Sequence, residues 1–252
     1  MFKLKYGVLA LCLCSFISTA KTCEQTIRVG LGSIWPPYYY EIDGQPKGIE
    51  IEIMELVFKQ ANFCVQYKKI VTMARNLVEL QQGNIDAVFA ASFNQEREKY
   101  GIYSIPYRTE RVRIFWPEPQ DNLLNRADLH QLISAGLVGA INVGSYFGPQ
   151  YDEYLNGKSR NEIVKIPTIS RKVKMLQHHR VDFILEDEIT GLYYLKENNI
   201  EGIVLHPYVV YQNEVAFLFS QKTFSTDQLS IINRAIRENL PQINAILARF
   251  QG

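Results

Sequence analysis

Two residues in the first half of the chain, Ser92 and Arg97, have the chemistry to hold a small anion. They follow the short apolar run 86–91, which is introduced by the turn Gly83-Asn84 and is typical of a buried parallel strand. The serine hydroxyl offers one donor, and the guanidinium offers a planar fork that fits a carboxylate. An arginine on a solvated loop fits the same pattern, so these residues alone leave both interpretations open.

An aromatic loop, residues 32–40, is expected to follow the first strand. Its two consecutive prolines exclude a helix and hold the backbone extended at the carboxyl end of that strand. Trp35 and Tyr38 then provide flat rings, which either form a stacking wall for a ligand or pack on the loop's own lobe. The density of rings in this segment favours one ring that faces a cleft, and we select Trp35 for that position.

Two segments of the second half have polar groups at expected helix starts. Ser145 lies in the turn 144–148, where backbone N–H groups can bind an anion. Taken alone, this serine fits an ordinary helix cap better. The acidic run 186–188, which contains Asp187, lies between a predicted strand and a predicted helix. These acids either face a cation or act as favourable charges at a helix N-terminus, and both interpretations stay open.

Apolar periodicity predicts two successive series of alternating strands and helices. The first series is expected to contain strands at 26–31, 64–71 and 86–91 and helices at 50–61 and 75–82. After a strand at 111–116, the second is expected to contain helices at 129–135, 170–179 and 189–196 and strands at 138–143, 162–166 and 181–185. A strand-like return at 204–220 and closing helices at 226–238 and 242–250 follow. This alternation predicts the α/β class with parallel sheets.

The material left after the second series indicates that the tail rejoins the first lobe, so that the chain crosses between two lobes twice. We expect a first lobe of residues 21–113 and 213–252 and a second lobe of residues 114–212. The carboxyl ends of the strands in both lobes then face one cleft, which is where ligands bind in folds of this class.

The first twenty residues have the organisation of a secretory signal peptide. Lys3 and Lys5 form a positive start, an apolar segment too short to span a bilayer follows, and small residues precede position 21. We therefore expect cleavage after Ala20, export, and a periplasmic location. A lipoprotein signal is the rival interpretation because cysteines lie nearby, but none of them follows the small residue that lipid attachment requires.

Cys23 and Cys64 remain after this cleavage and are expected to form a disulfide in an oxidising compartment. Cys23 precedes the first predicted strand and Cys64 opens the second, so the two are adjacent if those strands pair. The chain-entropy model gives such a bridge about 4 kcal/mol, less any strain. Two buried free thiols are the alternative.

The formal net charge of +1 over 252 residues gives no reason to expect a nucleic acid or a membrane surface as the partner. The four histidines show neither a nucleophile motif nor the spacing of metal ligands. We therefore expect no metal, no cofactor, and a monomer that binds a small molecule.

Several ordered motifs resemble one known family. Pro36-Pro37-Tyr38 resembles a Pro-Pro-Phe loop, residues 48–53 resemble Gly-Phe-Asp-Val-Asp-Leu, and residues 80–87 resemble Leu-x-x-Gly-x-x-Asp-Ala. Together with the Ser92/Arg97 spacing and the strand that leads to Asp187, they resemble the periplasmic solute-binding proteins of family 3, the polar amino-acid binders of ABC transporters. The resemblance covers the mature chain and implies a two-lobed periplasmic binding protein type II fold, with ligand capture by hinge closure and delivery to a membrane permease.

The resemblance also implies roles for single residues. Arg97 is expected to pair with the α-carboxylate of the ligand, assisted by Ser92 and Ser145, and Asp187 is expected to take the α-ammonium group. Trp35 matches the aromatic residue that packs on the ligand side chain in that family.

The chain departs from the family pattern in two places. The strand before Ser92 is one residue shorter than usual, which can shift this residue. Arg75 matches a subgroup with a further cationic contact, so that a dicarboxylate or another small anion is an alternative ligand. The alternatives to a carrier are a dehydratase-like enzyme that uses an acid of the run 186–188, and a solute sensor without transport.

Overall fold

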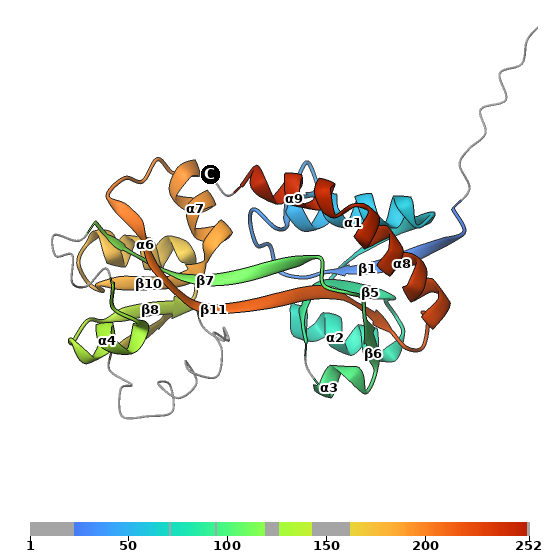
Figure 1. The fold of residues 1–252 in the computed structure, drawn as a ribbon, viewed down its shortest axis with the longest axis horizontal. Coiled ribbons are helices and arrows are strands. Elements are labelled where there is room, and N and C mark those ends of the chain that lie inside the picture. The colour runs from blue at the N-terminus through green and yellow to red at the C-terminus, as the bar shows by residue number, and fades with distance from the viewer. Residues whose placement is uncertain (1–22, 71, 94, 119–125, 143–161, 251–252) are drawn as a thin grey trace, which may run out of the picture.

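The computed structural model describes residues 23–70, 72–93, 95–118, 126–142 and 162–250 of the chain. The first half of the molecule, blue to green in Figure 1, is built by the elements before the first long crossing strand. They are β1 (Gln25–Leu31), β2 (Tyr40–Ile42), β3 (Gln45–Lys47), α1 (Ile49–Gln60), β4 (Phe63–Lys69), α2 (Met73–Gln82), β5 (Ala87–Ser92), α3 (Gln95–Glu98) and β6 (Gly101–Tyr103).

Two long strands connect the halves: the chain enters the second half through β7 (Arg108–Pro117) and returns through β11 (Ile203–Ser220). Between them lie α4 (Leu129–Ser134), β8 (Gly139–Asn142), β9 (Ile163–Ile166), α6 (Ile169–Gln177), β10 (Phe183–Asp187) and α7 (Glu188–Glu197). The tail returns to the first half as α8 (Thr226–Glu238) and α9 (Leu240–Ala248), which lie beside α1 (Figure 1). The C-terminal helices thus pack against the helix that follows the aromatic loop.

One mixed sheet connects the two halves. Its strand order in the described chain is β4-β1-β5-β11-β7-β10-β8-β9, and β6 pairs with β11. β1 is parallel to β4 and β5, and β8 is parallel to β9 and β10, as expected for α/β units. β7 and β11 instead run antiparallel to each other and to their outer neighbours. The crossings are thus sheet strands, and not loops between two purely parallel sheets, because pairing satisfies their backbone polar groups.

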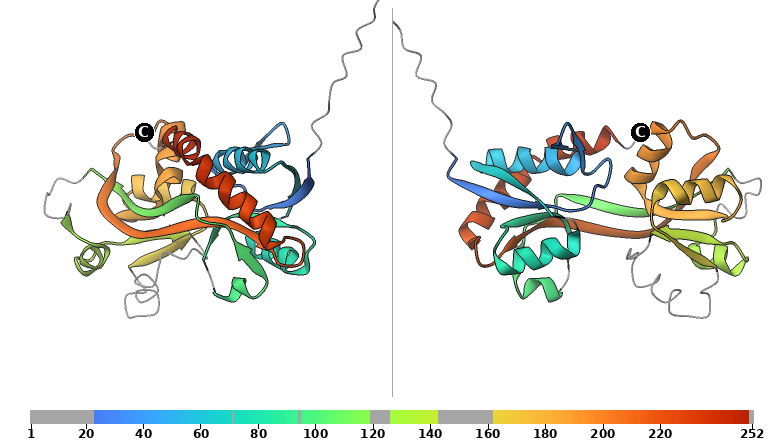
Figure 2. Two further views of the ribbon diagram at one scale, coloured as in Figure 1. Left: turned by 45° about the vertical axis from the view of Figure 1, so that its right-hand side comes forward. Right: turned by 180° about the vertical axis from the view of Figure 1, so that it is seen from behind.

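Helices cover both faces of the sheet in each half (Figures 1 and 2). In the first half, Phe58 of α1 packs on Phe217 and Phe219 of β11, with ring centroids 5.4 and 6.1 Å apart. The core of the second half is formed around Phe115 and Phe183, both buried. No helix in the described ranges is long and apolar enough to cross a membrane.

Local sequence explains how the elements at the junction of the halves begin. Gly48 precedes α1 with a φ of 116°, and a Cβ there would lie 2.5 Å from the carbonyl oxygens of Pro37 and Tyr38. A glycine is therefore required where the aromatic loop meets α1. Asp187 caps α7 by accepting a hydrogen bond from the Thr190 N–H at 2.8 Å.

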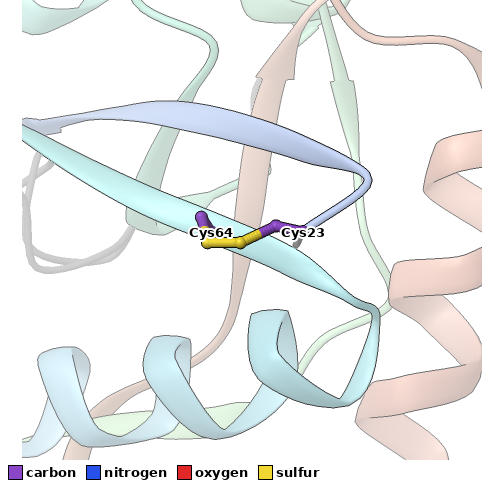
Figure 3. Close-up of a disulfide and its surroundings, with 2 residues drawn as sticks. All are labelled: Cys23 and Cys64. Atoms are coloured by element: carbon purple, nitrogen blue, oxygen red, sulfur yellow. A yellow bond between two sulfur atoms is a disulfide. The ribbon is translucent and has the colours of Figure 1, made fainter. Parts of the chain in front are cut away.

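The disulfide expected between Cys23 and Cys64 is present in the structure (Figure 3). The Cα atoms are 5.6 Å apart, and β4 is the parallel neighbour of β1, with Thr26 opposite Cys64. The strand pairing on which the prediction depended is thus observed.

Some predicted boundaries differ from the structure. β10 continues to Asp187, so that Glu186 and Asp187 lie within the strand and not beyond its end. The run 204–220 is one continuous strand. Ser145 and the helix expected after it lie outside the described residues, as does the predicted signal peptide.

Candidate functional site

A cavity of about 500 Å³ lies between the two halves. One wall is the aromatic loop of the first half, and the other is formed by the start of α6 and by α7 of the second half. The lining residues are Ser33, Ile34, Trp35, Pro36, Pro167, Thr168, Ile169, Glu186, Thr190, Tyr193, Tyr194, Glu197 and Asn198. Its volume lies within the range of roughly 300–1,000 Å³ that small-molecule sites occupy.

Trp35 is placed on this cavity by its loop. Its backbone exchanges two hydrogen bonds with Tyr39, at 2.7 and 2.9 Å, and its ring centroid lies 4.3 Å from that of Tyr38. The indole also lines a smaller cavity of about 230 Å³, which Phe89 and Ala90 of β5 border. Trp35 therefore stands between a cavity facing the second half and one facing the strand that leads to Ser92.

Asp187 and Tyr38 meet across the junction. The Tyr38 hydroxyl donates a hydrogen bond to Asp187 Oδ2 at 3.1 Å, although 149 positions separate them in sequence. Asp187 is only 5% exposed. Its pKa is raised from 3.8 to about 7, chiefly by burial and then by the negative charge of Glu110. The Tyr38 hydroxyl and the Thr190 N–H thus each occupy one acceptor position of this carboxylate.

A buried ion pair supports this contact from the first half. Arg108 Nη2 lies 2.6 Å from Glu50 Oε1, with both side chains fully buried, and the guanidinium carbon lies 4.2 Å from the centre of the Tyr38 ring. The Tyr107 hydroxyl donates a second, short hydrogen bond to Glu50. These contacts fix the ring of Tyr38 beneath Asp187.

Sequence reasoning missed the ion-pair residues, although a signal for them exists. Glu50 lies four residues before Met54 and seven before Val57, which places it on the buried face of an amphipathic helix. A carboxylate on such a face requires a cationic partner. Arg108 and Glu110, two positions apart in the crossing strand, share one face of it, and this arginine offers such a partner.

A second buried ion pair lies on the other side of Asp187. Lys172 Nζ of α6 is 2.9 Å from Glu186 Oε2 and donates to the carbonyl oxygen of Leu185 at 2.6 Å. Desolvation lowers the pKa of Lys172, and the charge of Glu186 opposes this shift. The negative charge of Glu186 is thus largely compensated before any ligand binds.

Ser92 and Arg97 contact each other in the structure. Arg97 Nη1 donates to the backbone oxygen of Ser92 at 3.1 Å, and Asn213 Nδ2 of the returning strand donates to Ser92 Oγ at 2.8 Å. The Arg97 side chain is half-buried. Arg97 lies on α3, shortly after the end of β5, and Asn213 was not among the residues predicted for this site.

Arg75 forms its ion pair within its own helix. It is exposed near the start of α2, and its partner is Glu79, one turn along the same helix. Met73, two residues earlier, lines the smaller cavity. Among the described residues, no group of three or more His, Cys, Asp or Glu side chains could hold a metal ion.

Comparison with known proteins identifies a matching family and a relative within the same class of binding proteins. A family model described as bacterial extracellular solute-binding proteins, family 3, matches residues 27–250. The probable amino-acid-binding protein YxeM of Bacillus subtilis (strain 168) is 21% identical over 222 residues, which cover 88% of this chain and 81% of that protein.

Solved structures show the same fold. An ancestral cationic amino acid solute-binding protein has a TM-score of 0.73 at 18% identity, over 90% of this chain and 96% of the other. The VFT2 domain of BvgS from Bordetella pertussis, a double mutant, has a TM-score of 0.69 at 19% identity, over 89% and 93%. The predicted two-lobed α/β fold of periplasmic binding proteins is therefore confirmed.

Proposed function

Because the chain belongs to the bacterial extracellular solute-binding proteins of family 3, we propose that it captures an amino acid by hinge closure and delivers it to the permease of an ABC transporter. Its family and its relative are named for binding and not for catalysis. The dehydratase-like enzyme considered above is not favoured. A solute sensor without transport would use the same binding step and differs in the partner.

The cavity between the two halves is the observation that carries this proposal. Its walls come from both halves, so a ligand there contacts both and favours the closed arrangement. The hydrogen bond from Tyr38 to Asp187 supports the same mechanism, because it already joins the halves at this point.

The proposed ligand contacts follow the family pattern. Arg97 pairs with the α-carboxylate, with Ser92 beside it and Ser145 completing the group. Asp187 takes the α-ammonium at an acceptor position of its carboxylate beside the one that Tyr38 occupies. The Trp35 ring packs on the ligand side chain. Arg75, near the start of α2, is assigned the remaining cationic contact.

The proposal includes the cellular setting. The family is extracellular by description, and a signal peptide over residues 1–20, cleaved after Ala20, would export the chain to the periplasm as a monomer. We propose that the first lobe comprises residues 21–113 and 213–252, and the second residues 114–212. Both divisions then fall within the long strands β7 and β11, where the hinge would act.

Thermal unfolding of the mature protein with each standard amino acid and with small dicarboxylates tests this function. A ligand at 100 times its dissociation constant adds about 2.7 kcal/mol, which is a shift of roughly 5–10 °C for a chain of this size. Arg97→Ala should abolish the shift, whereas Arg237→Ala, an exposed arginine on α8, should preserve it. A shift that survives in Arg97→Ala would refute the role of Arg97, and the absence of any shift with amino acids would refute the amino-acid ligand.

A further inference from the structure

We infer that the ligand of this protein carries an aromatic side chain, and that the cavity between the Trp35 loop and α7 receives the ring. This inference rests on the proposed function and goes beyond it, because it names the class of amino acid. It is drawn from the shape, the composition and the charge of the cavity walls.

Aromatic rings are contributed by both halves. Trp35 lines the cavity from the first half, and Tyr193 and Tyr194, on successive positions of α7, line it from the second. All three side chains are half-buried, so each keeps part of its surface available. Phe250, which follows α9, lies 6.3 Å from Tyr193 between ring centroids and packs against that ring. A planar ligand ring between these walls gains stacking or edge-to-face contacts in addition to area burial.

The remaining walls are mostly apolar. Pro36 and Pro167 face the cavity from opposite halves, and Ile169 lies at the start of α6. Ile34 at the cavity margin is 62% exposed and so presents apolar surface that a ligand can cover. A ligand ring that covers Ile34 would remove this apolar surface from water. A strongly polar ligand side chain would instead lose hydration against these walls.

The charged residues of the cavity lining argue against an acidic ligand side chain. Among the described lining residues there is no lysine or arginine, so the cavity provides no partner for a side-chain carboxylate. The two lining acids are Glu186 and Glu197. Glu186 is held by Lys172 at 2.9 Å, and Glu197 is exposed in the last turn of α7. A second carboxylate on the ligand would thus find no cation in this lining and would meet the charge of Glu197, so a dicarboxylate is disfavoured.

Hydrogen-bonding groups are few in comparison. The Thr190 hydroxyl is buried and lacks a hydrogen-bond partner in the described structure. Besides the tyrosine hydroxyls of α7, Ser33, Thr168 and Asn198 are the other uncharged hydrogen-bonding side chains of the lining. This set can satisfy one phenol or indole donor, and an aromatic ring without any donor leaves no buried ligand group unpaired.

Titration of the mature protein with L-phenylalanine, and with L-glutamine, L-arginine and L-glutamate for comparison, tests the inference. Phenylalanine does not absorb at the wavelengths that excite tryptophan, so the tryptophan emission of the protein can be followed during the titration. Trp35 lies in the cavity wall, whereas Trp116 is 3% exposed within the second-half core, so a ligand-induced change in emission reports on Trp35. We expect phenylalanine to bind at least tenfold more tightly than the other three amino acids.

Ile34→Ser and Ile42→Ser form a matched pair for this experiment. Both isoleucines are exposed, 62% and 52%, so neither change should disturb folding, and Ile42 lies on β2 outside the cavity lining. Ile34→Ser should weaken phenylalanine binding by about tenfold, and Ile42→Ser should not change it.

The outcomes separate this inference from the proposed function. If glutamine, arginine or glutamate binds and phenylalanine does not, the aromatic ligand class is overturned and the amino-acid function stands. If phenylalanine binds equally well to Ile34→Ser, the assignment of the ring to this cavity is overturned. If no amino acid binds, both the inference and the proposed function fail.

Discussion

Replacing Asp187 by asparagine is expected to stabilise the folded protein, and to do so more strongly as the pH rises. The pKa of this buried carboxyl is raised from 3.8 to about 7. Below pH 3.8 it is protonated in both the folded and the unfolded chain, so it has no effect on stability. Between 3.8 and about 7 the unfolded chain ionises first, and the free energy of unfolding falls with pH. Above about pH 7 Asp187 is ionised in both the folded and the unfolded chain, and the loss of stability, which we call the penalty, has reached its full size.

The size of this penalty follows from the shift. One pKa unit corresponds to about 1.4 kcal/mol, so that the shift amounts to roughly 4 kcal/mol near pH 8 and to roughly 1.6 kcal/mol near pH 5. An asparagine at position 187 stays neutral, can still accept from the Thr190 N–H, and can donate to the Tyr38 hydroxyl. The expected gain for Asp187→Asn approaches these values as upper limits.

Urea unfolding of the mature wild type and of Asp187→Asn at both pH values provides the measurement. Asp43→Asn, in an exposed turn, is the matched control and should change stability little at either pH. A gain that is the same at the two pH values, or a loss at both, would show that Asp187 titrates normally and would refute the reasoning.

Three further changes test other parts of the structure. Tyr38→Phe removes the hydroxyl that donates to Asp187, so the free energy of unfolding should fall by about 1 kcal/mol and scattering should report a larger radius of gyration; an unchanged radius would argue against a contact between lobes. Glu50→Gln leaves the buried Arg108 without its charge partner and should cost about 3 kcal/mol in urea unfolding, and a loss below about 1 kcal/mol would contradict the burial of that pair. Cys23→Ser should cost about 2–4 kcal/mol, and a reducing agent should lower the stability of the wild type but not that of the variant.

The fold was predictable because its elements repeat a local pattern. The helix at 226–238 begins and ends where the sequence predicts, since Ser225 caps it and its apolar spacing is regular. The crossing strands were only partly recognised. Their alternation is visible in sequence, but their antiparallel pairing depends on a register between residues about 100 positions apart, such as Val215 opposite Arg108.

The candidate site shows where reasoning from sequence ends. Ser92 and Arg97 are close in sequence, and their contact follows from one short loop. The contact between Tyr38 and Asp187 joins two halves of the molecule, so only the assembled fold brings it about. Similarly, Glu50 was assigned to an amphipathic helix without a partner, because nothing local identifies Arg108 as the cation that neutralises it.

The buried acids at the junction suggest why a small solute could move whole lobes. A penalty of roughly 4 kcal/mol is large beside the 5–15 kcal/mol that typically stabilises a domain. It arises chiefly from the burial of Asp187 and then from Glu110 on the neighbouring strand, while Arg108 and Lys172 are each already held by another carboxylate. A cation placed beside Asp187 would lower its pKa and recover part of that penalty. The α-ammonium of the proposed ligand supplies such a charge, and it is shielded from water only when the halves close over it. The same interaction with Asp187 would then favour both binding and closure. The ligand would bind the closed state more tightly than the open state, which is the condition for a ligand-driven hinge motion.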